Sequence, residues 1–239
     1  MTAALGIDVG MSGVRAAVVD EHGSLLGEGR SATRVAVSAD RAEADPRDWL
    51  CGALEAGAAA VAEARVVLDA IAVSALGPAP VLVTSDGEAV SPALLFGLDR
   101  RAEAQCARLG VSHDHALPKL LWWAEHEPER LARAATAVDA TGFVVAGLCG
   151  ALAMDTITAE AYAVAGVEPP LPLPSPCDPL ECAGGILPAA AAALGVTPGT
   201  PVIAGTLDSY ADVAGTGASP GTGCLLLGST LIAYAIWPQ

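Results

Sequence analysis

Lysine and aromatic residues are scarce in this chain of 239 residues. Aromatic side chains make up 4% of the sequence and hydrophobic ones 53%, so the core must be built from Ala, Val and Leu. Twelve Lys and Arg face 27 Asp and Glu, which gives a formal net charge of −15. Because the sequence shows no basic patch, nucleic acid and anionic membrane surfaces are excluded as expected partners. The single lysine, Lys119, follows Pro118 rather than a glycine-rich loop, which excludes a Walker-type phosphate loop.

Metal-type cysteine spacing is also missing. None of the six cysteines forms a CxxC pair or stands at zinc spacing from a histidine, so they are expected to be small buried hydrophobes in a reducing compartment. No signal peptide precedes the first predicted strand, and the sequence therefore predicts a cytoplasmic protein. The charge-free stretch 213–239 contains Pro220 and repeated glycine, which favours buried strands over a membrane span.

Strand and helix patterns alternate along the chain, which predicts an α/β fold. Asp45 and Pro46 are typical of a helix N-cap and first turn. The length suits one large domain or two small ones with a sizeable core. Strands are expected at residues 4–9, 14–19, 24–28, 70–74, 81–84, 201–205 and 222–227, helices at 46–66, 118–137 (interrupted at Pro128) and 187–194, and an extended proline-rich connector at 168–180.

Asp208 is the leading candidate for a catalytic residue. It follows the apolar run 202–204 and Gly205, and it opens a segment of small residues. A carboxylate just past a buried strand is where α/β enzymes place a general base. The alternative is a helix N-cap, a common use of Asp at a strand–helix junction.

Two further segments, 5–20 and 225–230, place glycine and hydroxyl residues beside apolar strands, as phosphate-binding backbones do. Asp8 in the first segment would hold a hydrated Mg²⁺, with Ser12 and Arg15 adding a donor and a charge. An ordinary hairpin, and for Gly228-Ser229-Thr230 a simple turn, are the alternatives. The order and separation of these segments and Asp208 favour function.

Two charged triplets are more ambiguous. Asp99-Arg100-Arg101 would present a carboxylate and a guanidinium to a polyol, or it would be a solvated helix start. His113-Asp114-His115 resembles a metal pair but has no third ligand at useful spacing, so a surface loop is favoured.

Several longer motifs together resemble the N-terminal domain of the FGGY family of carbohydrate kinases. Six segments resemble motifs of the family, in the family's order. They are the first phosphate motif (5–20), the D-P-x-x-W helix start (45–49), the D-x-R stretch (82–101), the L-L-W helix (120–128), the segment bearing the catalytic base (198–208) and the second phosphate motif (228–230).

The resemblance implies an actin-like, ribonuclease-H-like domain, with a mixed sheet flanked by helices, that phosphorylates a sugar or polyol hydroxyl with ATP. In that interpretation Asp208 takes the hydroxyl proton and Asp8 helps to place Mg²⁺ through water. The phosphates would be held by Gly10, Ser12, Arg15, Gly228, Ser229 and Thr230. The sugar would face Leu76, Gly77, Pro78, Asp99 and Arg101.

The chain also departs from the family pattern. Met11 replaces the usual threonine of the first phosphate motif, the loop 75–80 offers few polar side chains, and the region 165–184 is short. Family members continue into a second domain that carries the adenosine site. The resemblance therefore implies an N-terminal domain over residues 1–239, completed by a C-terminal kinase domain on another chain or by self-association, or else a fragment. The rival hypothesis is a degenerate domain that binds a sugar or a partner without catalysis. Another actin-like ATPase is disfavoured by the D-P-x-x-W and D-x-R stretches.

Overall fold

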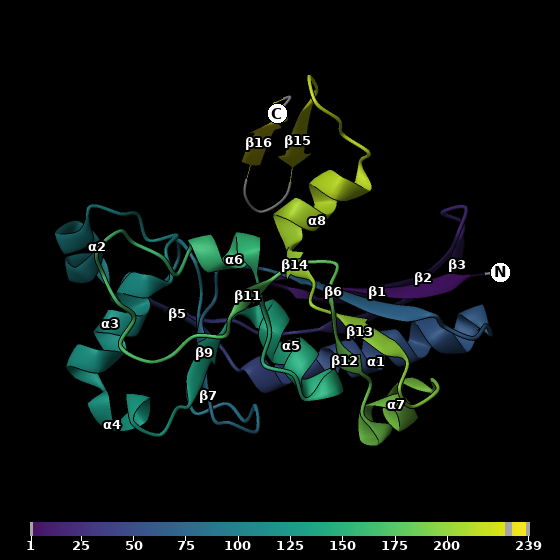
Figure 1. The fold of residues 1–239 in the computed structure, drawn as a ribbon, viewed down its shortest axis with the longest axis horizontal. Coiled ribbons are helices and arrows are strands. Elements are labelled where there is room, and N and C mark those ends of the chain that lie inside the picture. Colours follow the sequence, from purple (N-terminus) through teal and green to yellow (C-terminus); the bar gives the residue numbers. More distant parts are fainter. Residues whose placement is uncertain (1, 228–230, 238–239) are drawn as a thin grey trace.

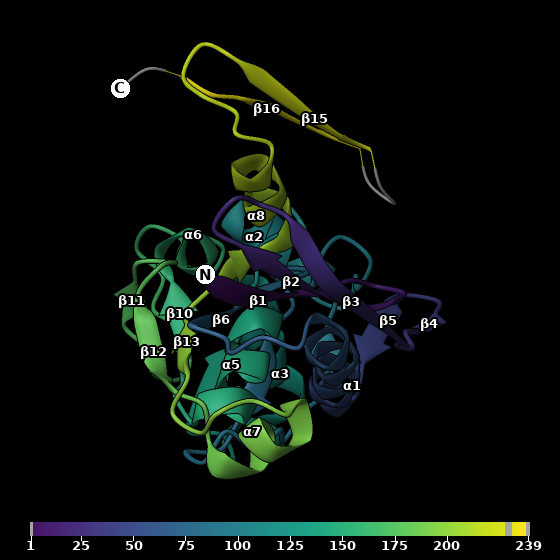
Figure 2. The same ribbon diagram turned by 90° about the vertical axis from the view of Figure 1, so that its right-hand side faces the viewer.

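A mixed β-sheet forms the centre of the computed structural model, which describes residues 2–227 and 231–237. Its strands run in the order β12-β13-β6-β1-β2-β3, and β14 pairs with β6 beyond the end of β13. Strand β2 is antiparallel to β1 and β3, whereas β6 is parallel to β1, β13 and β14 (Figures 1 and 2). The strands are β1 (Ala3–Val9), β2 (Gly13–Asp20), β3 (Leu25–Ala32), β6 (Ala70–Ala75), β12 (Cys182–Gly185), β13 (Pro201–Ile203) and β14 (Thr206–Leu207). The predicted mixed α/β sheet is confirmed.

Helix α1 (Pro46–Ala64) packs along β2 and β3 and against α5 (Ala140–Cys149) and α7 (Pro188–Leu194). As predicted, Asp45 caps α1 by accepting the Arg47 N–H, and α7 ends at Gly195. The contact with β3 is close, because a Cβ on Gly29 would lie 2.0 Å from the Ala56 carbonyl oxygen. Small residues therefore let the helix lie directly on the sheet.

A second apolar cluster lies beside the sheet and is built around Trp123, Leu120 and Tyr162. The cluster takes residues from α3 (Leu117–His126), α4 (Pro128–Leu131), α6 (Thr156–Glu160), β7 (Val81–Val83), β8 (Ala93–Leu94), β9 (Thr136–Val138), β10 (Met154–Asp155) and the segments between them. The other elements that precede α8 are α2 (Glu103–Leu109), β4 (Ala36–Ser38), β5 (Arg41–Ala44) and β11 (Pro176–Cys177). The prediction of helix through residue 137 was wrong at its end, because β9 pairs with β7. The connector 168–180 is mainly irregular, and β11 within it pairs with β10.

The last described elements form a hairpin of β15 (Gly223–Leu227) and β16 (Leu231–Ala235) that stands away from the sheet beyond α8 (Asp208–Gly215) (Figure 2). The strand prediction is confirmed here, but the expected burial was wrong, since Leu227 is 79% exposed and Leu231 67% exposed. The Tyr234 hydroxyl donates to Ser209 Oγ at 2.9 Å and so ties the hairpin to α8. None of the described helices is long and apolar enough to cross a bilayer.

Candidate functional site

The carboxyl ends of three parallel strands meet at one edge of the sheet. Strands β1, β6 and β14 end at Val9, Ala75 and Leu207, and Val9 and Ala75 are paired, as are Ala75 and Leu207. Crevices at such strand ends are where α/β proteins bind ligands. Here the edge carries the β1–β2 turn on one side and the start of α8 on the other.

Strand register places a row of polar residues across the sheet beside this edge. Asp8 pairs with Arg15 of β2 on one side and with Ser74 of β6 on the other. Beyond them, Arg30 of β3 pairs with Arg15, and Thr206 of β14 pairs with Ser74. Charged and hydroxyl groups from five strands are thus aligned at one level of the sheet.

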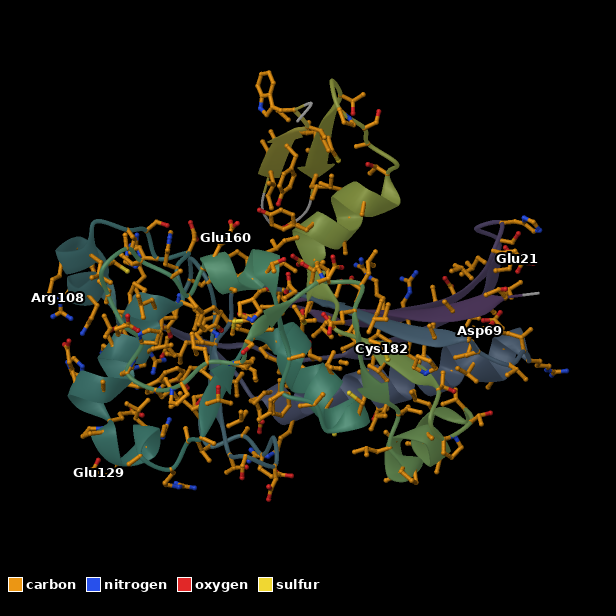
Figure 3. All side chains as sticks on the ribbon, viewed as in Figure 1. Glu21, Asp69, Arg108, Glu129, Glu160 and Cys182 are labelled. Atoms are coloured by element: carbon orange, nitrogen blue, oxygen red, sulfur yellow. The ribbon has the colours of Figure 1, made fainter. Side chains whose placement is uncertain are left out.

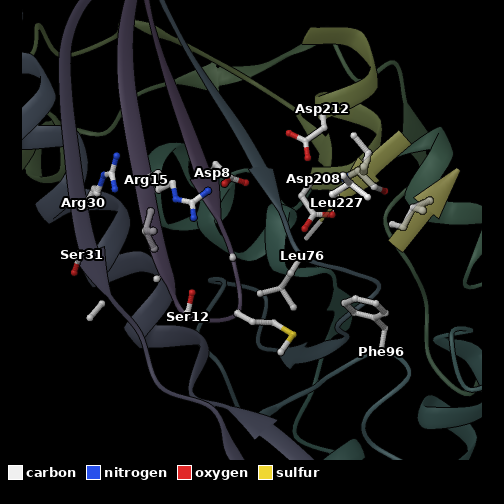
Figure 4. Close-up of a pocket in the computed structure, with 18 of the residues that line it drawn as sticks. Asp8, Ser12, Arg15, Arg30, Ser31, Leu76, Phe96, Asp208, Asp212 and Leu227 are labelled. Atoms are coloured by element: carbon white, nitrogen blue, oxygen red, sulfur yellow. Dashed lines mark hydrogen bonds between the residues drawn. The ribbon is translucent and has the colours of Figure 1, made fainter. Parts of the chain in front are cut away.

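The edge opens into a cleft of about 740 Å³, the candidate active site (Figure 4). It brings together five of the predicted site residues, namely Asp8, Gly10, Ser12, Arg15 and Asp208, with Leu76 of the predicted sugar loop. The remaining lining residues are Met11, Gly13, Val14, Arg30, Ser31, Ala32, Phe96, Ser209, Asp212, Leu225, Leu226, Leu227 and Ile232.

Asp208 begins helix α8 directly after β14. The N-cap is Leu207, which corrects the alternative that Asp208 is the cap. Asp208 Oδ1 accepts the Ser209 N–H at 2.6 Å. Burial is the largest cause that raises the pKa of Asp208, and the like charges of Asp8 and Asp212 add to it, so that the pKa reaches about 6 although the Ser209 hydrogen bond lowers it. A carboxyl with a pKa near 6 is ionised at neutral pH yet basic enough to accept a proton.

Asp8 lies on β1, facing Asp208 and Asp212 across the cleft (Figure 4). The Ser74 hydroxyl donates to its Oδ1 at 3.2 Å. Burial raises the pKa of Asp8, the Ser74 hydrogen bond lowers it, and among the charges Asp212 raises it and Arg15 lowers it. The Asp8 carboxylate therefore accepts one hydroxyl hydrogen bond and feels the positive charge of Arg15, at the cleft wall.

The β1–β2 turn supplies the glycine-rich wall. The Gly10 N–H donates to the Gly13 carbonyl at 2.9 Å and closes the turn, while Ser12 is exposed and Met11 half-buried. A Cβ on Gly13 would lie 2.5 Å from the Ser31 carbonyl oxygen, so glycine is needed for β3 to lie this close. The turn can therefore offer backbone N–H groups, one hydroxyl and the Arg15 guanidinium to an anion.

Buried acids behind the cleft fix the elements that carry it. Asp155 accepts hydrogen bonds from the hydroxyls of Thr158 and Thr206, so it anchors β14. Asp139 accepts the Ala79 N–H at 2.9 Å and the Tyr162 hydroxyl at 3.0 Å. Complete burial raises the pKa of Asp139 to about 6. These contacts hold the end of β6 and the start of α8 in place.

Of the predicted sugar-facing loop 76–78, only Leu76 lines the cleft. Leu76 lines the cleft, whereas Pro78 is buried and a Cβ on Gly77 would lie 2.4 Å from Leu207 Cδ2 and 2.6 Å from Asp139 Oδ1. The loop therefore presents one apolar side chain and packs its other members behind the cleft wall.

Asp99 and Arg101 do not line the cleft. Both are buried, and Arg101 donates to Asp99 from Nε at 2.8 Å and from Nη2 at 2.7 Å, and also to Glu43. Asp99 Oδ2 in turn accepts the Ala42 N–H at 2.9 Å. The alternative of a solvated helix start is wrong, because this ion pair joins β5 to the segment before α2.

Gly228, Ser229 and Thr230 lie outside the described residues. Arg30, Asp212 and Phe96 also line the cleft, although they were not predicted from the sequence. Arg30 is recognisable only once β3 is paired in register with β2. For Asp212 a signal was available, because it stands four residues after Asp208 and so shares its face of α8. Outward-facing acids and bases such as Glu21, Arg108 and Glu129 lie at the periphery of the molecule, away from this cleft (Figure 3).

The described residues contain no group of three or more His, Cys, Asp and Glu side chains arranged to hold a metal ion directly. Mg²⁺ commonly keeps several waters and is bound by one or two carboxylates together with substrate phosphates. Asp8, with a hydroxyl donor on Oδ1 and an open cleft before it, fits that water-mediated mode.

Solved structures of kinases share the fold of this chain. A xylulose kinase from Rhodospirillum rubrum superposes with a TM-score of 0.83 at 23% identity, covering 93% of this chain and 52% of that one. A glycerol kinase from Plasmodium falciparum with ADP superposes with a TM-score of 0.84 at 12% identity, covering 98% of this chain and 54% of that one. At these identities the likeness establishes the fold, the actin-like α/β class.

Sequence relatives specify the family. A xylulose kinase from Streptomyces rubiginosus is 33% identical over 269 residues, covering 97% of this chain and 54% of the relative. One from Bacillus subtilis is 27% identical over 250 residues, covering 89% and 49%. No protein-family profile matches the chain. These relatives confirm the predicted resemblance to the N-terminal domain of the FGGY carbohydrate kinases, and the chain spans about half the length of the curated relatives it matches.

Proposed function

We propose that this chain is the sugar-binding and catalytic-base half of a carbohydrate kinase, which transfers the γ-phosphoryl group of ATP to a hydroxyl of a sugar or polyol. The observation that carries the proposal is the cleft at the ends of β1, β6 and β14. It holds Asp208, whose pKa is raised to about 6, opposite a glycine turn with Ser12 and Arg15.

In the proposed reaction Asp208 accepts the proton of the substrate hydroxyl as its oxygen attacks the γ-phosphorus. The new O–P bond forms as the bond from the γ-phosphorus to the β,γ-bridging oxygen breaks, so ADP leaves with that oxygen. Ionised Asp208 is the competent form, which requires a pH above about 6. Asp212 and Asp8 raise the basicity of Asp208 by keeping negative charge near it.

The phosphates and the metal ion would be bound at the wall of the cleft opposite Asp208. Arg15 and the backbone of the turn at Gly10 would hold phosphate oxygens, with Ser12 as a donor in place of the threonine that Met11 replaces. Asp8 would hold hydrated Mg²⁺, which neutralises phosphate charge when bound. The adenosine would be bound by a second domain, on the same or another polypeptide, with Gly228, Ser229 and Thr230 contributing to the phosphate site.

A ketopentose such as D-xylulose is the proposed substrate, since the curated relatives named above are xylulose kinases. Isothermal titration of the chain with D-xylulose, D-ribulose, D-gluconate and glycerol tests this. We expect D-xylulose to bind, and Asp208→Ala to weaken binding about 10- to 100-fold, because a charge-assisted hydrogen bond to the hydroxyl is lost. Asp86→Asn, in an exposed turn, is the control. The proposal fails if no compound in the panel binds, or if Asp208→Ala binds as tightly as the wild type.

A second candidate, a sugar-binding domain without catalysis, is favoured by one observation. Met11 lines the cleft at the turn where a phosphate donor is expected, and a thioether cannot donate. This candidate predicts the same sugar binding but no phosphoryl transfer, so it is separated from the first by turnover.

A further inference from the structure

A second cleft, of about 720 Å³, shares no lining residue with the candidate active site. It lies between the segment 34–36, the end of β5, the first turn of α1, the segment 89–92 and the end of α4. Its lining residues are Arg34, Val35, Ala36, Glu43, Ala44, Asp45, Arg47, Asp48, Ala89, Val90, Ser91, Pro92, Arg130 and Arg133.

Arginine is concentrated in this second cleft. Four of the chain's twelve Lys and Arg residues line it, although the chain as a whole carries a net charge of −15. They come from separate segments: Arg34 follows β3, Arg47 is in α1, Arg130 is in α4 and Arg133 follows α4. An acidic protein gains nothing in solubility from collecting its few cations in one place, so the arrangement points to an anionic ligand.

Two of these arginines are anchored within the protein. Arg47 Nη2 donates to the Ala89 carbonyl at 3.0 Å, and its Nη1 lies 3.5 Å from Asp45 Oδ1. Arg130 Nε lies 3.1 Å from Glu127 Oε2. These contacts hold the two guanidinium groups at the cleft wall and leave further N–H donors on each for a ligand.

The other two arginines are exposed and available. Within residues 2–227 and 231–237, no carboxylate lies within salt-bridge distance of Arg34 or Arg133. Three acids line the cleft against the four arginines: Glu43 is already paired with buried Arg101, Asp45 lies 3.5 Å from Arg47, and Asp48 is the third. The charge left facing the cleft is therefore positive, and two complete guanidinium forks are free to bind oxygen pairs.

We propose that this second cleft binds a small phosphate ester, such as a sugar phosphate. Guanidinium groups bind phosphate oxygens in pairs, and the cleft volume lies within the range of small-molecule sites. Asp45 and Asp48 at the same wall suit the hydroxyls of a sugar, because carboxylates accept hydroxyl hydrogen bonds. A nucleic acid does not fit, since the rest of the acidic surface would repel a long polyanion. The inference is independent of catalysis in the first cleft.

Calorimetric titration of the whole chain with glucose 6-phosphate and with pyrophosphate, at low ionic strength, tests the proposal. We expect Arg34→Gln/Arg133→Gln to weaken binding of glucose 6-phosphate at least about tenfold, because two charge-assisted contacts are lost. Arg65→Gln, which removes an exposed positive charge just past the far end of α1, should bind like the wild type. Circular dichroism confirms that each variant is folded.

Phosphate binding at the first cleft is distinguished by Arg15→Gln. If the proposal holds, glucose 6-phosphate binding survives in Arg15→Gln and is lost in Arg34→Gln/Arg133→Gln. The reverse pattern, equal weakening by Arg65→Gln, or no binding of either probe to the wild type at millimolar concentration would overturn it.

Discussion

Asp208 has three causes for its raised pKa: burial, which is the largest, and the like charges of Asp8 and Asp212. Asp212 lies one helical turn beyond Asp208 on α8 and also raises the pKa of Asp8. Asp212 is exposed and acts on both carboxyl groups through its charge, so Asp212→Asn is expected to leave the fold intact.

We predict that Asp212→Asn lowers the pKa of Asp208 below about 6, since one like charge is withdrawn from the ionised form. Titration of the Asp208 carboxyl carbon by NMR measures this directly on the chain. The matched control Asp178→Asn, in the connector, should leave the midpoint unchanged. An unchanged or higher midpoint in Asp212→Asn would show that Asp212 does not act on Asp208.

At the scale of elements, the cleft depends on how β14 follows β13. Gly205 between them has φ +72°, and a Cβ there would lie 2.0 Å from the Val73 carbonyl oxygen on β6. The chain can therefore run beside β6 at this distance only with glycine, and this path carries Asp208 to the sheet edge.

We predict that Gly205→Ala destabilises the protein by about 3 kcal/mol or more, because the backbone must move away from β6. Gly195→Ala is the matched control: its φ is +74°, and nothing lies within 4 Å of the added Cβ, so only the cost of the backbone conformation remains. Urea unfolding measures both variants. Equal losses in the two would mean that the close approach to β6 is not a constraint.

Elements with local signals were predictable from the sequence. The β1–β2 turn is marked by its glycines, α1 by Asp45 and Pro46, and α7 by Gly195, and each needs only its own segment. Strand β9 was not predicted, because its three residues follow a helical run and form a strand only by pairing with β7. Such a long-range contact is not visible in local propensity. The exposed hairpin of β15 and β16 was misjudged for the reason that apolar sequence indicates burial only when a partner surface is present.

In the candidate site, too, the residues with local sequence signals were predictable and the others were not. Asp8 and Asp208 could be predicted because Asp8 lies near the end of one apolar strand and Asp208 directly follows another. Arg30 depends on the register between β2 and β3, and Asp99 and Arg101 depend on which long-range partner their charges meet. Pairing across the fold, rather than residue type, decided these outcomes.

At the scale of the whole molecule, raised carboxyl pKa values link stability to pH. Asp139 is fully buried with a pKa of about 6, against an ordinary value of 3.8. Between these two values the folded state holds a proton that the unfolded state has released. Stability from this group is therefore present below about pH 4 and is lost as the pH rises to about 6.

We predict that the free energy of unfolding falls by up to about 3 kcal/mol between pH 4 and pH 6 on account of Asp139, two pKa units at about 1.4 kcal/mol each. Asp139→Asn cannot titrate, so its unfolding free energy should fall less over the same range, whatever its stability at pH 7. Urea unfolding at intervals of half a pH unit measures both slopes. Parallel curves for the two proteins would exclude a raised Asp139 pKa.

The most direct test of the proposed kinase is sugar-dependent ATP consumption with Asp208 intact and replaced by Asn. It should be measured on the chain alone and on the chain joined to the second half of the Streptomyces rubiginosus xylulose kinase, so that an adenosine site is present. We predict D-xylulose-dependent turnover in the joined protein, lowered about 10²- to 10⁴-fold by Asp208→Asn. Turnover that is unchanged by Asp208→Asn, or its absence from a joined protein that binds both ATP and D-xylulose, would contradict the account.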